Sequence, residues 1–481
     1  MGGARRPRNG CPDYTPAHAS HPAVLGSHPM TVAADPADLR VYIEAVRALL
    51  AHGGFERSGD VSLAKKWDID HVVAWLEARG RPDRRRTVHV AGSKGKGSVA
   101  TITAAILHAA GAHTLLLTSP DLHAARERIA IDGAPIDPAA FARVARSVLD
   151  DPACATWSYF ELLTAMGWLA GAEAGCDWQV VEVGLGGRLD TTNAMASKEV
   201  AVITPIDLEH TEILGDTLPQ IAAEKAGIIT GPCEVVAEPM RASALDVVRA
   251  RAAEQGATFH EVTSECAMRV TSMNLDGQKL DLRTPLRTYR NLETALIGPY
   301  QSENLATAVR AAELAWASTG EELPEQAVRD AVRRLRLPGR LDVVHQRPLV
   351  LLDGLHTPLA ARRFAEALRA LPVPARRVWV VGVLSGKNVD GMLEPLISEG
   401  DEVIVVPPPS PRAADPAEVA RAVRARGALV QRAPTVEAAL DRAMESAGPA
   451  GAVLVVGSLY TVAAAREHLL GVAGDHALGL R

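Results

Sequence analysis

The stretch TVHVAGSKGKGS, residues 87–98, decides the fold of this chain. Its first four residues alternate with β-branched side chains, which predicts a short strand. Three glycines in the loop that follows allow the backbone N–H groups to turn inward toward an anion. Apolar residues then recur at helical spacing from Val99, and Gly111 ends the run. A strand, a glycine loop and the start of a helix together predict a phosphate cradle in an α/β domain.

The loop itself supplies the candidate nucleotide contacts. Lys96 provides the point charge for the outer phosphates. The spacing is shorter than the usual G-x-x-x-x-G-K-[ST], and a glycine-rich turn without a ligand would be the simpler interpretation of an isolated loop. The strand before the loop and the helix after it favour nucleotide binding. The predicted nucleotide-binding residues of the loop are Gly92, Ser93, Lys94, Gly95, Lys96, Gly97 and Ser98.

Composition limits the class of protein. A chain of 481 residues is too long for one ordinary core, so two domains are expected. Hydrophobic residues make up 47% and charged residues 22%, which is ordinary for a globular protein, and the 4% of aromatic residues predicts an aliphatic core. The net charge of −6 argues against nucleic acid as the main partner. No apolar run approaches the roughly 20 residues that a membrane span needs.

The N-terminus and the cysteines point to a cytoplasmic protein. Residues 1–35 are rich in Gly, Pro, His and Arg and lack an apolar segment, which predicts a disordered extension and not a signal peptide. Met30 is an alternative start. The five cysteines are odd in number, are widely spaced and form no C-x-x-C motif. Free thiols in a reducing compartment, without a zinc site, are therefore expected.

Strands alternate with helices after the phosphate loop, which predicts a parallel α/β sheet. Apolar strands are predicted at 114–117, 178–183 and 200–204. Ser119 follows the first of these, and Glu182 lies among apolar residues in the second. A buried carboxylate needs an ion pair or a metal, and ligands of α/β sheets bind at the carboxyl ends of strands. Residues 232–296 are expected to be less regular, with strands around 266–283.

The pattern restarts after a predicted hinge at Leu337-Pro338-Gly339-Arg340. Strands are predicted at 349–352, 378–383, 403–406 and 453–456, with helices between them. These strands predict a second, smaller doubly wound domain. The expected boundaries are 36–336 for the first domain and 340–481 for the second.

Several long motifs follow one another along the chain: HVAGSKGKGS, TSPDL, SYFELLTAM, EVGLGGRLDTTN, EHTEILGDTLPQIAAEKAGII, YQSEN, PGRLD, DGLHTP, PRA and GSLY. In this order they resemble the folylpolyglutamate synthase and dihydrofolate synthase family of the Mur ligase superfamily. The resemblance runs from about Phe55 to His468. It implies an N-terminal P-loop ATPase domain with a mostly parallel sheet, and a smaller C-terminal Rossmann-like α/β domain, with the site in the cleft between them.

The resemblance implies an ATP-dependent ligase that uses Mg²⁺. ATP would phosphorylate a carboxylic acid, and the amine of an amino acid, glutamate, would attack the acyl phosphate. The implied acid is dihydropteroate or tetrahydrofolate, a pterin or folate. A diverged ligase that uses a non-folate acid or another amine in a specialised pathway is the alternative. A non-catalytic nucleotide-binding protein and a P-loop kinase are weaker interpretations, and a monomer is expected.

The resemblance also assigns metal ligands. It implies that Ser119 and Glu182 bind a first Mg²⁺ and that His210 binds a second. The lysine that matches Lys225 is carbamylated in the family, which turns a cation into an anionic oxygen ligand. A helix-cap or surface role for His210 and an exposed Lys225 paired with Glu224 are the alternatives. Lys96, His210 and Lys225 are the implied catalytic residues.

The remaining site residues are implied by position in the motifs. Asn304, Arg340 and Asp353 match residues that hold ATP, and His356 belongs to the motif of the amino-acid site. Phe160 and Asp190 match residues that line a pterin pocket, where a ring stacks and a carboxylate accepts from ring N–H groups. A plain core position is the alternative for Phe160.

The sequence departs from the family pattern at five motifs, mostly around acid and amino-acid binding. The phosphate and metal positions are intact, so these changes are expected to affect the choice of substrate more than phosphoryl transfer. Asp121 replaces a histidine at a position assigned here to substrate binding. The residues that depart are Asp121, Glu209, Tyr300, Leu355, Thr357 and Asn388.

Overall fold

The computed structural model describes residues 35–64 and 68–480. The predicted disordered extension at 1–35 and the alternative start at Met30 lie outside the described residues, apart from Asp35. The Asp35 carboxylate accepts the backbone N–H of Ala37 at 2.9 Å and caps the first helix, α1 (Pro36–Ala51). The described structure therefore begins at Asp35, the last residue of the predicted extension.

Strand β1 (Arg86–Ala91) lies near the middle of the larger sheet, which has eight strands within the described part of the chain. Its two neighbours are β5 (Trp178–Glu182) and β6 (Val200–Ile203), and both pair with it in parallel. Only the β3–β4 edge is antiparallel, so the predicted mostly parallel sheet is confirmed. The other strands are β2 (Thr114–Leu117), β3 (Ile129–Ile131), β4 (Ala134–Pro135), β7 (Glu234–Ala237) and β8 (Thr258–Glu261).

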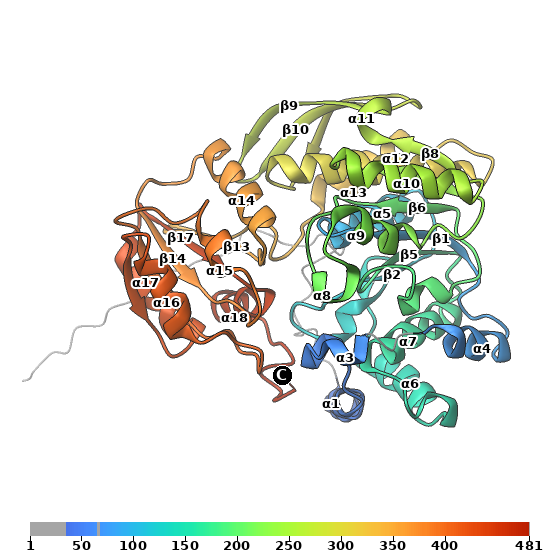
Figure 1. The fold of residues 1–481 in the computed structure, drawn as a ribbon, viewed down its shortest axis with the longest axis horizontal. Helices are drawn as coiled ribbons and strands as arrows, with labels where there is room; N and C mark the ends of the chain where they lie inside the picture. The colour runs from blue at the N-terminus through green and yellow to red at the C-terminus, as the bar shows by residue number, and fades with distance from the viewer. Residues whose placement is uncertain (1–34, 65–67, 481) are drawn as a thin grey trace, which may run out of the picture.

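Helices cover both faces of this sheet (Figure 1). One face is covered by α5, α12 and α13, whose apolar residues pack on Val88 and Val90 of β1. The other face is covered by two groups, α1, α4, α6 and α7 around β2 and α9 and α10 around β6. Burial on both faces explains why the strands are continuous apolar runs. The bounds are α4 (Asp70–Ala78), α5 (Lys96–Ala109), α6 (Pro138–Leu149), α7 (Tyr159–Glu173), α9 (Leu218–Ala226), α10 (Ala242–Glu254), α12 (Pro299–Ala317) and α13 (Glu325–Arg334).

Residues 234–261 continue the regular strand–helix–strand pattern, so the prediction of less regular structure there is wrong. Helix α10 has many charged residues and alanines, and it buries only Ala244, Val248 and Ala252, which leaves little apolar contrast in the sequence. The strands predicted around 266–283 are present. They form an antiparallel three-stranded sheet of β9 (Ala267–Asn274), β10 (Gly277–Arg283) and β11 (Thr288–Thr294).

The second lobe is built on a six-stranded sheet in the order β12-β13-β17-β14-β15-β16. Helices α14 to α16 cover one face and α17 and α18 cover the other. The four predicted strands are present, whereas β12 and β16 were missed because their side chains are only partly buried or are exposed. The elements are β12 (Asp342–Gln346), β13 (Leu349–Asp353), α14 (Pro358–Ala370), β14 (Arg377–Val381), α15 (Val389–Leu393), β15 (Glu402–Val405), α16 (Pro416–Arg424), β16 (Leu429–Arg432), α17 (Val436–Ala447), β17 (Ala452–Val456) and α18 (Leu459–Leu470).

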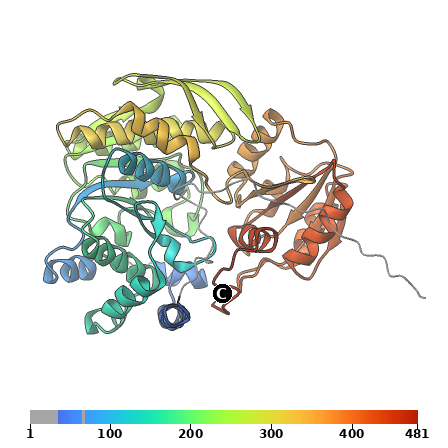
Figure 2. The ribbon, with the colours of Figure 1, turned by 180° about the vertical axis from the view of Figure 1, so that it is seen from behind.

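The two lobes lie side by side, and the C-terminal residues cross from the second back to the first (Figures 1 and 2). The Asp475 carboxylate accepts from the Tyr42 hydroxyl at 2.9 Å and from the Ala125 N–H at 2.8 Å. Leu480 is buried in the core formed with α1 and α7. The C-terminus therefore fastens the second lobe to the first.

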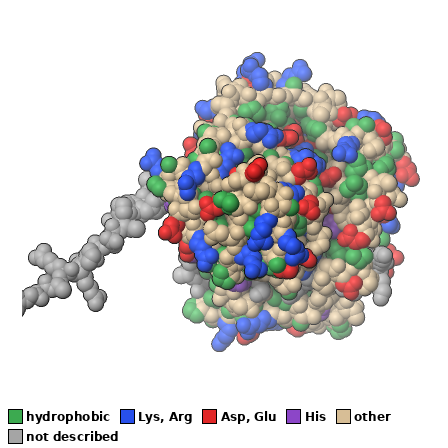
Figure 3. Space-filling view, turned by 60° about the vertical axis from the view of Figure 1, so that its left-hand side comes forward, with side chains coloured by type: hydrophobic (Ala, Val, Ile, Leu, Met, Phe, Trp, Pro, Cys, Tyr) green, Lys and Arg blue, Asp and Glu red, His purple; other side chains and the backbone are tan. Residues whose placement is uncertain are grey.

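The distribution of surface charge and the state of the cysteines agree with what the composition predicts. On the face shown in Figure 3, basic and acidic side chains are interspersed. Among the helices that the structure describes, none has the length and apolar character that crossing a membrane requires. The four cysteines in the described ranges are free thiols, as predicted. The cytoplasmic location stays a prediction.

Candidate active site

The phosphate loop joins β1 to α5 as predicted, and two of its positions require glycine for steric reasons. A Cβ atom on Gly92 would lie 1.8 Å from the Thr204 hydroxyl oxygen, and φ at Gly92 is +145°. Gly95 adopts φ +91°, and a Cβ there would lie 2.6 Å from the Asn304 side-chain oxygen. The Ser93 N–H donates to the Pro205 carbonyl at 2.9 Å, which anchors the loop to the end of β6. Only glycine at 92 and 95 lets the loop take this path.

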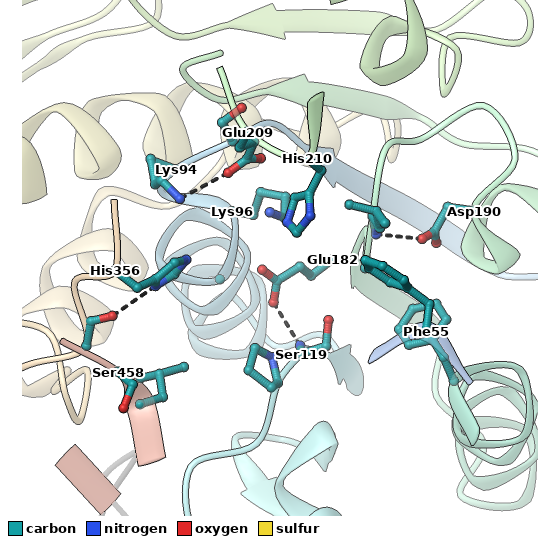
Figure 4. A pocket seen from close by; sticks show the side chains of 18 of the residues that line it. Phe55, Lys94, Lys96, Ser119, Glu182, Asp190, Glu209, His210, His356 and Ser458 are labelled. Carbon is teal, nitrogen blue, oxygen red and sulfur yellow. Dashed lines mark hydrogen bonds and ion pairs between the residues drawn. The ribbon is translucent and has the colours of Figure 1, made fainter. Parts of the chain in front are cut away.

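A cavity of about 390 Å³ opens at the phosphate loop and extends to the second lobe (Figure 4). Two predicted site residues, Gly92 and Asp121, are not among its lining residues. The other predicted residues come together there from both lobes. They are Ser93, Lys94, Gly95, Lys96, Gly97, Ser98, Ser119, Phe160, Glu182, Asp190, His210, Lys225, Asn304, Arg340, Asp353 and His356.

Glu182 is the buried carboxylate at the end of β5, and 6% of its surface is exposed. Its Oε2 accepts the backbone N–H of Ser119 at 2.9 Å, so the two predicted metal ligands touch (Figure 4). Burial raises the pKa of Glu182, and the nearby Lys96 ammonium opposes that shift. Glu182 therefore presents a poorly solvated carboxylate beside the phosphate loop.

Lys225 is fully buried in α9, which excludes the interpretation as an exposed lysine. Its Nζ donates to the Gly92 carbonyl at 2.8 Å and to Glu209 Oε1 at 3.1 Å. Burial lowers the Lys225 pKa to about 8. Glu224, the partner in the excluded interpretation, accepts from Arg188 at 2.9 Å.

Glu209 bridges two lysines of the site. Its second oxygen, Oε2, accepts from Lys94 Nζ at 3.0 Å. Burial opposes ionisation of Glu209, but the ammonium groups of Lys94 and Lys225 outweigh burial and hold its pKa well below the ordinary value. Glu209 stays an anion that ties the phosphate loop to α9.

His210 precedes the short helix α8 (Thr211–Leu214) with a left-handed backbone, φ +49°. It occupies the N-cap position, but its side chain makes no capping hydrogen bond and instead lines the cavity. Burial lowers its pKa to about 4, so the imidazole is neutral near pH 7. A neutral ring nitrogen is a competent metal ligand or hydrogen-bond acceptor.

Phe55, Phe160 and Asp190 line one end of the cavity, called here the aromatic end. Figure 4 shows Phe55 and Asp190 at this end. The Phe160 ring fits against Gly184, where a Cβ atom would lie 2.5 Å from the ring. Phe160 is half-buried and lines the cavity, so it is not a plain core residue. Asp190 Oδ2 accepts the Leu185 N–H at 2.9 Å, which fixes the carboxylate at the wall.

The second lobe contributes Asp353 at the end of β13. Its Oδ1 accepts the Leu355 N–H at 2.9 Å, and its Oδ2 accepts the Leu341 N–H at 2.9 Å and the Tyr300 hydroxyl at 3.2 Å. Tyr300 belongs to α12 of the first lobe, so this hydroxyl crosses between the lobes. His356 follows Asp353 in the chain, and burial keeps its pKa well below the ordinary value.

The residues that depart from the family pattern fall into two groups, those that line the cavity and those that do not. Glu209, Tyr300 and Leu355 line the cavity. Asp121 instead accepts from Arg128 Nε at 2.7 Å, and its predicted contact with the acid substrate stays a prediction. Thr357 caps α14 by accepting the Ala360 N–H at 3.4 Å.

Several lining residues were not predicted as site residues. The cations Arg363, Lys387 and Arg412 lie on the second-lobe wall of the cavity. Arg412 belongs to the PRA motif, which was a usable signal, whereas no local pattern distinguishes Arg363 on α14. Phe55 lines the cavity from the one-turn helix α2 (Phe55–Ser58). With Lys94 and Lys96 these cations make the cavity suited to a polyanion.

Two Mur ligase families match the chain. The Mur ligase middle domain matches residues 90–312, and the Mur ligase glutamate ligase domain matches residues 339–459. The dihydrofolate synthase/folylpolyglutamate synthase of Mycobacterium tuberculosis is 33% identical over 434 residues, which cover 83% of this chain and 89% of that protein. The chain belongs to the folylpolyglutamate synthase and dihydrofolate synthase family of Mur ligases. The predicted family is confirmed.

Other members of this family agree. The Escherichia coli dihydrofolate synthase/folylpolyglutamate synthase is 33% identical over 384 residues, covering 79% of this chain and 85% of that protein. The M. tuberculosis folylpolyglutamate synthase complexed with ADP and AMPPCP has a TM-score of 0.78 at 32% identity and covers 89% of this chain and 98% of that one. The E. coli FolC structure in complex with DHPP and ADP has a TM-score of 0.72 at 30% identity and covers 85% and 97%. The predicted two-lobed α/β fold is confirmed.

Proposed function

We propose that this chain is an ATP-dependent ligase that joins glutamate to dihydropteroate or to a reduced folate. The observation that carries the proposal is one cavity that holds a phosphate loop, a buried carboxylate and an aromatic end with an acceptor carboxylate. The names of the family members, which are dihydrofolate and folylpolyglutamate synthases, support the same reaction. The DHPP and ADP bound to the E. coli relative support a pterin-type acid and a nucleotide as ligands.

ATP would bind across the two lobes. The loop N–H groups and Lys96 would hold the β- and γ-phosphates, with Arg340 and Asp353 on the far side. Asn304 supports a nucleotide base nearby, because its Oδ1 is buried without a partner among the described residues while its amide donates to Gln301 at 2.8 Å. A buried acceptor without a donor is costly, and a base or ribose donor would satisfy it.

The oxygen donors of the site fit Mg²⁺. In the described ranges no group of three or more His, Cys, Asp and Glu side chains is arranged to hold a metal alone. Mg²⁺ in nucleotide sites takes only one or two carboxylates, and phosphates and waters complete its shell. Glu182 and Ser119 would hold the first ion. When bound, Mg²⁺ would neutralise charge on the transferring phosphoryl group.

The second metal position depends on Lys225. Neutral His210 suits a metal, whereas the Lys225 ammonium would repel one. A carbamate on Lys225 would supply an anionic oxygen, and burial favours the neutral amine that reacts with CO₂. We therefore propose that Lys225 is carbamylated in the active protein.

The reaction has two balanced steps. A substrate carboxylate oxygen attacks the γ-phosphorus of ATP, which gives an acyl phosphate and ADP. The neutral amine of glutamate then attacks the acyl carbon, the bond to phosphate breaks, and inorganic phosphate and a proton leave. The aromatic end would orient the acid, and Lys387, Arg412 and His356 on the second-lobe wall would orient the amino acid.

The two-lobed cavity also supports the predicted organisation. We propose domains at 36–336 and 340–481 with a hinge at 337–340, where Gly339 adopts φ +71°. Since both walls of the cavity come from one chain, we propose that the monomer is active. The test is ADP release in a matrix of acids and amino acids, in which turnover with folate acids and glutamate supports the proposal.

A further inference from the structure

A chain of buried polar side chains runs behind the aromatic end and ends at Asp190. Lys198 Nζ lies 3.4 Å from His89 Nδ1, and His89 Nε2 lies 2.9 Å from the Thr192 hydroxyl oxygen. The Thr192 hydroxyl in turn donates to Asp190 Oδ1. His89 is in β1, three residues before the phosphate loop begins at Gly92, so this hydrogen-bond chain includes the strand that carries the loop.

Donor and acceptor rules set the direction of this chain. An ammonium group has only donors, so His89 Nδ1 accepts from Lys198 and its proton lies on Nε2. His89 Nε2–H therefore donates to the Thr192 hydroxyl oxygen. That leaves the single Thr192 proton for Asp190 Oδ1, which also accepts the Thr192 N–H at 3.0 Å. In every hydrogen bond of this network the donor lies on the side of Lys198 and the acceptor on the side of Asp190.

Because its members are buried, this hydrogen-bond network costs folding free energy unless every donor and acceptor in it has a partner. His89 is fully buried, and the exposed fractions are 2% for Thr192, 4% for Asp190 and 7% for Lys198. Lys198 also donates to the Ile228 carbonyl at 2.6 Å and to Asn193 Oδ1 at 2.9 Å, so its hydrogen bonds need no carboxylate. Burial lowers the pKa of His89 well below its ordinary value and that of Lys198 to about 8. A buried network is strong only when each member is satisfied.

The hydrogen-bond chain would act on one oxygen of Asp190, Oδ1, and leave the other, Oδ2, without a bond from Thr192. Oδ1 takes both bonds from Thr192, whereas Oδ2 takes the Leu185 N–H. An ionised carboxylate has about four acceptor positions, and Asp190 accepts three hydrogen bonds by geometry, with the Gly184 N–H close by. One lone pair of Oδ2 therefore remains for a donor from a ligand. Burial raises the pKa of Asp190, and donation into Oδ1 opposes that shift and fixes the rotation of the carboxylate.

We propose that His89 is a positioning residue for the acid substrate, which it controls through Thr192 and Asp190, and that Lys198 fixes the tautomer of His89. The inference rests on the proposed function of Asp190 at the aromatic end. The inference predicts that His89, although it lies in the strand that carries the phosphate loop, affects the KM for the acid and not the KM for ATP.

Variants of His89 and Thr192 separate positioning from structural support. His89→Leu and Thr192→Val break the chain, whereas His89→Gln and Thr192→Ser keep one donor and one acceptor at each place. Thr103→Val is the matched control, because Thr103 is fully buried and its hydroxyl has no partner among the described residues. The second pair of variants keeps the test open should His89→Leu fail to fold.

Steady-state kinetics give the first readout. We expect the breaking variants to raise the KM for the acid by about 10-fold or more, the effect of losing a hydrogen bond to a charged group, with the KM for ATP unchanged. The conserving variants should restore most of the acid KM, and Thr103→Val should leave it unchanged. Equal increases in both KM values, or breaking variants that match wild type, would overturn the inference.

The histidine tautomer gives a readout that does not depend on the substrate. In the wild-type protein labelled with ¹⁵N-histidine, the His89 signal, assigned from its loss in His89→Gln, should show a neutral ring protonated on Nε2 at pH 7. A proton on Nδ1, or protonation of both ring nitrogens at pH 7, would refute the hydrogen-bond chain. Should the wild type accept only a non-folate acid, the proposed function fails, while the inference is judged by the same spectrum and by the KM for that acid.

Discussion

The carboxylate of Glu209 accepts from the buried ammonium group of Lys225 at 3.1 Å. The same ammonium group donates to the Gly92 carbonyl at the start of the phosphate loop. A lysine in α9 is thereby joined to the loop that is proposed to hold ATP. The chemical state of this lysine therefore affects both the loop and the charge of the site.

Replacing Lys225 with alanine should abolish amide formation, because it removes the proposed carbamate and the bond to Gly92. Bicarbonate or a short carboxylic acid should restore part of the activity by supplying an anionic oxygen. Density for a carbamate in a crystal structure grown with bicarbonate is the direct check. The exposed Lys279→Ala variant is the control and should behave as wild type. A bare ammonium group in a fully active, bicarbonate-free preparation would refute the carbamate.

Substituting Gly95 with alanine should impair ATP use, because the added methyl group meets Asn304 and forces the loop to move. A displacement of about 1 Å at a catalytic loop costs on the order of 10²-fold in kcat/KM. Gly111→Ala is the matched control, since Gly111 also has a positive φ of +104° but open space around it. That variant should lose stability and keep its KM for ATP. Equal kinetics in both variants would contradict the assigned role of the loop.

Glu182→Gln should weaken the dependence on Mg²⁺ without unfolding the protein, since the amide oxygen can still accept the Ser119 N–H. We expect the Mg²⁺ concentration at half-maximal ADP release to rise by at least about 10-fold, the effect of losing even an outer partner of a metal ligand. Titration of ADP release with MgCl₂ at saturating ATP measures this. An unchanged half-saturation point would show that Glu182 is structural.

Glu238 should make stability depend on pH. Both of its oxygens are buried without a partner among the described residues, and burial raises its pKa to about 8. Its folded pKa exceeds the unfolded value near 4.5, so its contribution is complete below pH 4.5 and is lost as pH rises to about 8.

Glu238→Gln should therefore gain stability relative to wild type between pH 5 and pH 8, by up to about 1.4 kcal/mol per pH unit. Urea unfolding at pH 5, 6.5 and 8 measures the difference, and the exposed Glu445→Gln variant controls for charge. A difference that stays constant with pH would mean that Glu238 does not titrate in this range.

Sequence patterns correctly predicted the features that depend only on residues close together in the sequence. The strand, loop and helix at residues 86–109 were predictable because glycine positions and apolar spacing lie within one short stretch. The capping box of Thr217 and Gln220 was predictable for the same reason, and the structure contains it. The motifs also placed both walls of the cavity.

Contacts distant in sequence were not predictable in the same way. The partner of His89 is Lys198, 109 residues away, and neither residue carries a local signal of a shared network. Asp121 was expected at the substrate because of its motif, whereas the fold brings Arg128 to it. Arg363 lies at the cavity only because α14 packs near α12, which no pattern in either helix specifies.

Release of ADP by the wild-type protein with Mg²⁺, ATP, glutamate and dihydropteroate or tetrahydrofolate tests the central claim most directly. Lys96→Ala supplies the background, and a panel of aryl and aliphatic acids is run beside the folates. We predict ADP release that requires ATP, glutamate and a folate acid together, with formation of the glutamyl product by mass spectrometry and loss of turnover in Lys96→Ala. Turnover with another acid and none with any folate would contradict the claim.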